Sequence, residues 1–255
     1  MIDRVGIIGV GHLASYLVEG INHTSPKMEI ILSPRNKDHA KRLARKFGAF
    51  IAKNNQEVAD KTNMVILSTR PNDSAKVAAD IKFHQNHVLI SVAAGLTIDQ
   101  LKPFVGPATI IRAMPLSSSA INISPTLMFP DHPQVRSLFQ LVGDVLIVPK
   151  ESIFTPASAI AAFYGWLYAL MDEAISWTVQ EGVPYAIARK LILKTVYSAV
   201  GMSLAQSEHS MSLILESLAT KGGITEQGLL ILKEENGLKA WSNALQAVLN
   251  KLHKN

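Results

Sequence analysis

The stretch Val5-Gly-Ile-Ile-Gly-Val-Gly-His-Leu-Ala14 decides how the rest of the chain is organised. Val5–Ile8 is a short apolar run typical of a strand, and a helical pattern begins directly after the last residue of the stretch. Between strand and helix lies G-x-G-x-x-A, a dinucleotide-binding fingerprint in the context that it requires. Gly9 allows the tight turn, Gly11 lets a pyrophosphate approach the backbone, and Ala14 lets helix and strand pack closely. The alternative is a glycine turn without a ligand, which the position after the first strand disfavours.

Composition limits the class of protein. Of 255 residues, 48% are hydrophobic and 18% charged, which suits a packed core and argues against disorder. Because the chain has no cysteine, disulfides, thiolate catalysis and zinc–thiolate sites are excluded. The longest uncharged apolar run, residues 156–171, is shorter than the roughly 18 residues of a membrane span. No signal-peptide pattern precedes the first strand, so the sequence predicts a cytoplasmic protein without membrane association.

The formal net charge of +5 raises the question of an anionic partner. The densest basic run, Lys37–Lys46, alternates with apolar residues at helical spacing, and Gly48 follows as a candidate C-terminal cap. This pattern indicates the solvated face of an amphipathic helix. Since no aromatic residues are interleaved for base stacking, no nucleic-acid partner is expected.

Strands and helices alternate through the first 151 residues. Beyond the first strand, strand-like runs fall at 29–32, 49–52, 64–69, 88–93, 109–114, 126–129 and 145–148, and helical runs at 37–46, 56–61, 73–81, 97–101 and 133–142. Thr97 and Gln100 form a capping box at the start of one helix. The alternation predicts βαβ units in a mostly parallel sheet, and therefore an α/β, Rossmann-type domain over residues 1–151.

From residue 152 to 255 no strand pattern remains, and the sequence predicts an all-helical domain. Helical runs fall at 157–181, 185–206, 210–219, 225–235 and 238–252. The first run is apolar nearly all round, which predicts burial on every side. A helical domain of this size would bury such a helix against a second subunit, so we expect dimerisation or a higher homo-oligomer.

Ligands of an open α/β sheet lie beyond the carboxyl ends of its strands. The candidate cofactor-binding residues there are Gly9, Gly11, His12, Leu13, Ser33, Arg35, Ser68, Thr69, Arg70, Pro71, Ala93, Ala94 and Gly95. NAD enzymes usually place an acidic residue after the second strand, whereas this chain has Ser33 and Arg35. A hydroxyl and a cation suit a 2′-phosphate, so NADP is favoured over NAD. The alternatives are a charged turn without a ligand and, for the loops at 68–71 and 93–95, ordinary connections.

One turn of the helical half is unusual. Paired glycines, Gly222 and Gly223, precede a helix that we expect Thr225 to cap. The turn is either plain capping or a nest of backbone N–H groups for a carboxylate, with Lys221 adding positive charge.

Neither a metal site nor a catalytic triad is expected. The eight histidines show no ligand spacing, and His12, His84, His87 and His209 are each expected to be exposed to solvent. No Ser/His/Asp order and no carboxylate pair stand out.

Four motifs resemble those of the pyrroline-5-carboxylate reductase family. They are the glycine stretch from Gly6 to Ala14, Ser91-Val-Ala-Ala-Gly95, Arg112-Ala-Met-Pro115 and Lys221-Gly-Gly-Ile-Thr-Glu-Gln-Gly-Leu229. The resemblance implies a Rossmann domain followed by a helical dimerisation domain, and reduction of a cyclic imine to proline with NAD(P)H. It implies a substrate loop of Thr220, Lys221, Gly222, Gly223 and Ile224, in which the glycine amides bind the substrate carboxylate. It also implies that the Thr225 hydroxyl lies near the imine nitrogen.

The chain departs from the family pattern mainly in the substrate elements. The family's Ser-Gly-Ser-Gly-Pro-Ala-Tyr corresponds to Ile160-Ala-Ala-Phe-Tyr-Gly-Trp166, which is bulkier and lacks the serines. Residues 116–118 also differ from the family's Asn-Thr-Pro, and Ile224 replaces the first threonine of the family's pair. Two alternatives therefore stay open beside pyrroline-5-carboxylate reduction: a reductase of a different imine, and a non-catalytic NADPH-binding paralogue.

Overall fold

The computed structural model describes residues 3–253, which form two compact units. The first unit holds the described residues up to 161 together with 249–253, and the second holds residues 162–248. The sequence pattern changes at 151/152, whereas helix α7 (Glu151–Ser158) belongs to the first unit by its contacts.

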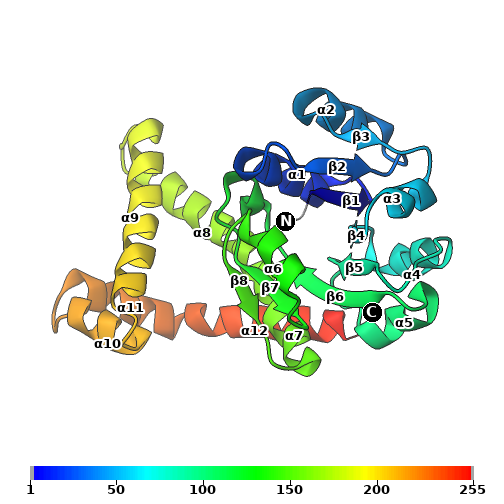
Figure 1. The fold of residues 1–255 in the computed structure, drawn as a ribbon. Coiled ribbons are helices and arrows are strands. Elements are labelled where there is room, and N and C mark those ends of the chain that lie inside the picture. Colours follow the sequence, from blue (N-terminus) through cyan, green and yellow to red (C-terminus); the bar gives the residue numbers. More distant parts are fainter. Residues whose placement is uncertain (1–2, 254–255) are drawn as a thin grey trace. The chain divides into compact units, whose positions relative to one another are not determined.

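The first unit is built on an eight-stranded sheet in the order β3-β2-β1-β4-β5-β6-β7-β8 (Figure 1). All neighbouring strands are parallel except β6 and β7, which confirms the mostly parallel Rossmann-type sheet. The strands are β1 (Arg4–Ile8), β2 (Glu29–Leu32), β3 (Phe50–Ile51), β4 (Met64–Leu67), β5 (Val88–Ser91), β6 (Thr109–Met114), β7 (Thr126–Phe129) and β8 (Val145–Ile147).

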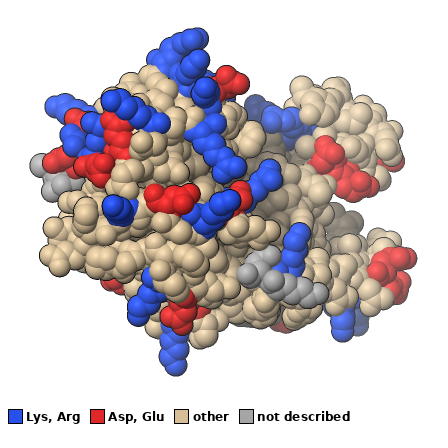
Figure 2. Space-filling model, turned by 90° about the vertical axis from the view of Figure 1, so that its right-hand side faces the viewer, with Lys and Arg blue, Asp and Glu red and all other residues tan. Residues whose placement is uncertain are grey.

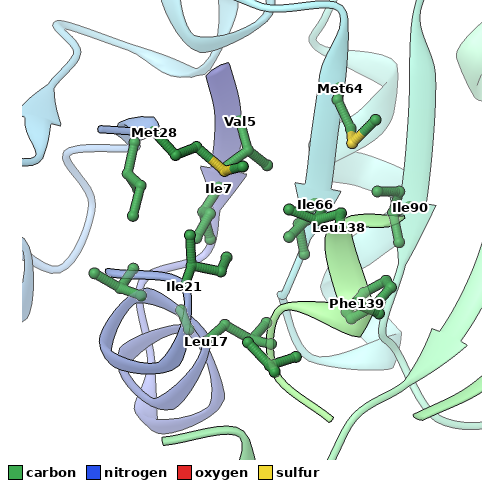
Figure 3. Packing of buried hydrophobic residues seen from close by; sticks show 14 of the residues in the cluster. Val5, Ile7, Leu17, Ile21, Met28, Met64, Ile66, Ile90, Leu138 and Phe139 are labelled. Atoms are coloured by element: carbon green, nitrogen blue, oxygen red, sulfur yellow. The ribbon is translucent and has the colours of Figure 1, made fainter. Parts of the chain in front are cut away.

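Six α-helices cover the two faces of this sheet. They are α1 (His12–Thr24), α2 (Lys37–Phe47), α3 (Asn55–Lys61), α4 (Pro71–Ala79), α5 (Ile98–Val105) and α6 (Pro133–Gln140). Helices α1, α2 and α6 share one hydrophobic core with the sheet, and α3, α4 and α5 share the other. In the first core, Leu17 and Ile21 of α1 and Leu138 and Phe139 of α6 lie over the central strands (Figure 3). Neighbouring strand residues point to opposite faces, so Ile7 joins the first core and Ile8 the second.

Local capping signals in the sequence are confirmed. Gly48 ends α2 in the left-handed conformation, with φ 70°, and the Thr97–Gln100 capping box begins α5. Helix α2 is amphipathic as predicted: Ala40 and Leu43 are buried, and its basic residues are exposed. Lys and Arg side chains gather along the upper part of the face in Figure 2, at the height of α2 in Figure 1.

An unpredicted 3₁₀ helix, η1 (Ser117–Ile121), lies against α1. The side-chain nitrogen of Asn122, the residue after η1, lies 2.7 Å from the Gly20 carbonyl oxygen and 2.8 Å from the Thr24 hydroxyl. The same nitrogen lies 2.7 Å from the carbonyl oxygen of Leu141. One side chain therefore links α1, η1 and the end of α6.

The second unit consists of helices. The long helices are α8 (Ile160–Gln180), α9 (Tyr185–Ala205) and α12 (Gly237–Leu252), with α10 (Met211–Leu218) and α11 (Ile224–Glu234) between them. The expected burial of the first long helix on every side is not found within the chain. Among the described residues, α8 buries only Ile175 and α9 only Ala188, while Trp177, Tyr197 and Leu204 are exposed. This apolar surface has no partner within residues 3–253.

Length and composition single out one helical stretch of the described chain, residues 151–180, as apolar enough to cross a membrane. An 18-residue window within this stretch has a mean hydropathy of 1.3, and 17% of that window is buried among the described residues. The uncharged apolar run at 156–171 lies inside this stretch. A helix that is covered by a second subunit has the same composition.

Candidate active site

The candidate cofactor residues follow four strands that are adjacent in the sheet. In the order β2-β1-β4-β5, the strands lead into Ser33–Arg35, Gly9–Leu13, Ser68–Pro71 and Ala93–Gly95. The strand order reverses between β1 and β4, which is the topological switch point where open α/β sheets bind dinucleotides. The structure therefore brings all of these loops to one edge of the sheet.

The glycine loop has the geometry that a pyrophosphate requires. Gly9 has φ +94°, and Gly11 is the N-cap of α1, where no described side chain forms a cap hydrogen bond. A Cβ placed on Gly11 would meet nothing within 4 Å, so the backbone is open to a close approach. The first amides of α1, starting with His12, have no acceptor within their own helix, and the helix dipole adds a positive field. These features fit the phosphates of a dinucleotide.

Ser33 has a structural contact that was not predicted. Its side chain is buried, at 1% exposure, and its hydroxyl accepts a hydrogen bond of 3.0 Å from the Gly9 amide. The Ser33 hydroxyl therefore holds the glycine loop against β2, and its contact with a 2′-phosphate stays a prediction. Arg35, two residues further on, is exposed at the same strand end.

The two remaining loops are shaped by local contacts. In the loop after β4, the Thr69 hydroxyl lies 2.8 Å from the Ser74 hydroxyl, and Arg70 caps α4 with Pro71 as the first helical residue. In the loop after β5, Ala93 is buried and Gly95 has φ +76°.

The histidines are arranged differently from the prediction in one case. His87 is buried: its Nδ1 accepts a 2.7 Å hydrogen bond from the His84 amide, so its Nε2 carries the proton and donates to the Ala59 carbonyl at 3.0 Å. His12 is exposed, with its ring edge-on to that of His39 at 5.3 Å. Within residues 3–253, no group of three or more His, Asp or Glu could hold a metal ion.

A buried ion pair near the site was not predicted. Arg112 of β6 is 1% exposed, its Nη1 donates to Glu151 Oε1 at 3.0 Å, and its guanidinium lies 4.2 Å from the Phe154 ring centre. Burial lowers the pKa of Arg112 below its usual value, and the hydrogen bond and charge of Glu151 oppose that shift. A charge inside the apolar strand Thr109–Met114 was the available signal, because a buried cation requires a partner.

The glycine turn of the second unit differs from its expected form. The N-cap of α11 is Gly223 rather than Thr225, so the prediction of a threonine cap is wrong and Thr225 lies inside the first turn. The Gly223 amide donates to the Thr220 carbonyl at 2.9 Å, and the Gly222 amide donates to Glu226 Oε2 at 2.6 Å. The two glycine amides are therefore bound within the turn, and one of them already binds a carboxylate.

The aromatic residues of the altered segment 160–166 have partners in their own unit. The Phe163 ring lies edge-on to Trp241 of α12 at 5.5 Å, and Trp166 lies 6.2 Å from the same ring. The hydroxyls of Tyr164 and Tyr168 lie 2.9 Å apart. Helix packing therefore accounts for the bulk of Phe163 and Trp166.

A glycine loop that opens a helix at the switch point of a parallel sheet defines the class of NAD(P)-binding Rossmann proteins. Residues 4–95 match the family described as NADP oxidoreductase, coenzyme F420-dependent, and residues 151–254 match the pyrroline-5-carboxylate reductase dimerisation family. The chain is 30% identical to pyrroline-5-carboxylate reductase 3 of Xenopus laevis, over 95% of this chain and 92% of that protein. It belongs to the pyrroline-5-carboxylate reductase family.

Other pyrroline-5-carboxylate reductases also match this chain over nearly their whole lengths. The pyrroline-5-carboxylate reductase of Escherichia coli is 24% identical over 100% of this chain and 98% of its own. The solved structure of 1-pyrroline-5-carboxylate reductase from Streptococcus pyogenes has a TM-score of 0.89 at 26% identity, covering 99% and 98% of the two chains. A Plasmodium falciparum pyrroline carboxylate reductase, solved with NADP bound, has the same fold, with a TM-score of 0.88 at 21% identity over 98% and 97%.

Proposed function

We propose that this protein reduces 1-pyrroline-5-carboxylate to L-proline with NADPH. The observation that carries the proposal is a pyrophosphate-competent glycine loop at the switch point of a chain that matches these reductases along its full length. In this reaction a hydride adds to the carbon of the C=N bond and a proton remains on the nitrogen. NADPH, when bound, supplies that hydride.

The first unit binds the cofactor in this proposal. The glycine loop and the start of α1 hold the pyrophosphate, and the Ser33 hydroxyl fixes the Gly9 amide that shapes the loop. Arg35 remains as the cation for a 2′-phosphate, and the P. falciparum reductase of the same fold was solved with NADP. The loops at 68–71 and 93–95 bind the nicotinamide half of NADPH, because they follow β4 and β5, on the other side of the switch point from β1 and β2.

The turn before α11 binds the substrate carboxylate. Support comes from Glu226, whose carboxylate accepts a hydrogen bond from the Gly222 amide in the same turn. A substrate carboxylate that takes this amide displaces Glu226, and Lys221 adds a positive charge. Thr225 lies in the first turn of the same helix, where its hydroxyl orients the imine nitrogen. Because a neutral threonine is a weak acid, we assign it to holding the protonated iminium rather than to proton donation.

The reaction is tested by following NADPH oxidation at 340 nm with pyrroline-5-carboxylate. We expect rapid oxidation that depends on the substrate. NADPH binding with turnover only of other cyclic imines would identify a different imine reductase. Tight NADPH binding without turnover of any imine would identify a non-catalytic paralogue.

The cofactor preference is tested in the same assay with NADH. The wild-type protein should prefer NADPH, and Arg35→Ala should raise the KM for NADPH about tenfold, since a charged hydrogen bond to phosphate contributes roughly 1.5–3 kcal/mol. The KM for NADH should not change. An equal loss for both cofactors would show that Arg35 does not read the 2′-phosphate.

Thr225→Ala should lower kcat by about 10- to 100-fold, because the iminium is no longer held in line with the hydride. Thr225→Ser, which keeps the hydroxyl, is the matched variant and should retain most of the activity. The affinity for NADPH should be the same in all three proteins. Wild-type kcat in Thr225→Ala would remove this residue from the mechanism.

We also propose that the second unit pairs with a second copy of the chain in the cytoplasm. The support is its match to a dimerisation family together with the exposed apolar residues of α8 and α9. Burial between subunits would also account for the hydropathy of residues 151–180.

A further inference from the structure

The loop Val92–Thr97, which connects β5 to α5, is flanked by Arg112 on one side and by the carboxylate that binds Arg112 on the other. At its start, Ser91 is the register partner of Arg112 on the neighbouring strand β6. At its end, the amide of Ile98 donates a 2.8 Å hydrogen bond to Glu151 Oε1, the oxygen that also accepts from Arg112 at 3.0 Å. The loop that contains Ala93–Gly95 thus begins at the strand partner of Arg112 and ends at a hydrogen bond to the carboxylate that binds Arg112.

The Glu151 oxygen joins three elements that are distant in sequence (Figure 1). Glu151 is the first residue of α7, Arg112 belongs to β6, and Ile98 is the first residue of α5. In the capping box, the Thr97 amide donates to the Gln100 side chain and the Gln100 amide donates to the Thr97 hydroxyl. The box does not use the Ile98 amide, which donates to the carboxylate of Glu151 instead. The start of α5 is therefore positioned by α7 and β6 as well as by its own sequence.

Among the described residues, Glu151 is the carboxylate that pairs with Arg112. Its Nε and Nη2 have no hydrogen-bond partner among the described residues, and the face of its guanidinium lies on the Phe154 ring. Because a buried cation is costly without its counter-ion, Glu151 has one strongly preferred position, with Arg112 at 1% and Glu151 at 25% side-chain exposure.

We propose that Glu151 and Arg112 are positioning residues for hydride transfer, which set the height of the loop Val92–Thr97 on the nicotinamide side of the cofactor site. The inference rests on the proposed function, in which Ala93–Gly95 line that side. Neither side chain touches the reacting atoms in this proposal. They act through the loop backbone, and a displacement of about 1 Å in such a loop costs a large factor in rate.

The test uses the full-length protein and two ligands that separate the halves of the cofactor. NADPH occupies both halves, whereas 2′,5′-ADP occupies only the adenosine half. Glu151→Leu removes the shared acceptor and should weaken NADPH binding about tenfold while changing the Kd of 2′,5′-ADP less than about twofold. Its kcat with pyrroline-5-carboxylate should fall by a similar factor. Glu151→Gln keeps an oxygen that accepts from both Arg112 and Ile98, so it should restore the NADPH affinity and most of kcat, although it lowers Tm.

Two further variants keep the proposal falsifiable. Glu151→Asp retains the charge beside Arg112 but shortens the reach to Ile98, so it should reproduce the loss in NADPH affinity with a smaller loss of Tm. Glu29→Leu removes the carboxylate of the exposed Arg4–Glu29 pair and is the matched control, which should change neither ligand affinity.

The outcomes separate the two proposals. A folded Glu151→Leu variant with wild-type affinities and kcat would overturn the positioning role, and so would an equal weakening of NADPH and 2′,5′-ADP, which indicates general destabilisation. If the wild-type protein does not reduce pyrroline-5-carboxylate, the proposed function fails, but the ratio of the two affinities still tests the loop.

Discussion

Gly9→Ala should destabilise the first unit strongly, whereas Gly11→Ala, two residues away, should leave its stability unchanged. A Cβ on Gly9 would lie 2.6 Å from the Ser68 carbonyl oxygen and 2.9 Å from Thr69 Cγ2, on a backbone with φ +94°. Neither the end of β4 nor the left-handed conformation accommodates it. We expect a loss of about 3 kcal/mol in the free energy of unfolding, seen as a decrease in Tm of about 6–12 °C.

Gly11→Ala is the matched control for that experiment. Its Cβ would meet nothing within 4 Å, and its φ of −103° is allowed for alanine. The methyl group would instead project where the pyrophosphate approaches, so the Kd of NADPH should increase about 10- to 100-fold, or roughly 1.4–2.8 kcal/mol. Calorimetry of the apo proteins and titration with NADPH separate the effects. Equal Tm values for wild type and Gly9→Ala would contradict the first prediction, and an unchanged Kd in Gly11→Ala the second.

Of the single methyl groups that could be added to helix α1, the one in Gly20→Ala should cause the largest loss of stability. A Cβ there would lie 1.9 Å from the Ser119 carbonyl oxygen and 3.0 Å from Val142 Cγ1, so α1 and η1 have to separate. Separation also breaks the hydrogen bond from Asn122 to the Gly20 carbonyl. We expect a loss of at least about 3 kcal/mol, or soluble expression that fails altogether.

Gly228→Ala provides the comparison, because it adds the same methyl to a helix position with nothing within 4 Å. That variant should keep or slightly raise Tm, since alanine is favoured over glycine by about 1 kcal/mol inside helices. Similar melting temperatures for Gly20→Ala and the wild type would show that α1 and η1 can move apart at little cost in stability. Asn122→Ala, which removes only the hydrogen bonds, should lie between the two in Tm.

The strands could be predicted from the sequence because each one is a short apolar run with a turn signal at its end. Met64–Leu67, for example, is buried at every position, as strands covered on both faces are. The cofactor loops could be located for the same reason, since the carboxyl ends of parallel strands share one edge. The element η1 was missed because Ser117–Ile121 has no helical periodicity, and its position depends on α1.

Side-chain orientation could not be predicted, because it depends on partners far along the chain. Ser33 accepts a hydrogen bond from the Gly9 amide in the loop after β1, although its residue type suits a phosphate equally well. His87 lies in a polar segment, and its buried ring depends on a contact far along the chain, the Ala59 carbonyl of α3. The partner of Arg112 is 39 residues away in sequence. Residue type and spacing therefore placed the candidate loops at one edge of the sheet, but the contacts of individual side chains required the fold.

The packing of α1 has a consequence for the order in which the chain can fold during synthesis. Helix α1 packs against η1, Asn122 binds its last turn, and Leu138 and Phe139 of α6 belong to the same hydrophobic core (Figure 3). The segment 4–95 that matches the oxidoreductase family ends before any of these residues. A nascent chain of that length has made the nucleotide-binding loop but lacks η1, Asn122 and α6, so part of the first hydrophobic core is still uncovered. The dinucleotide site should therefore become stable only after α6 has left the ribosome, so a fragment that ends at residue 95 is expected to aggregate rather than to bind a cofactor.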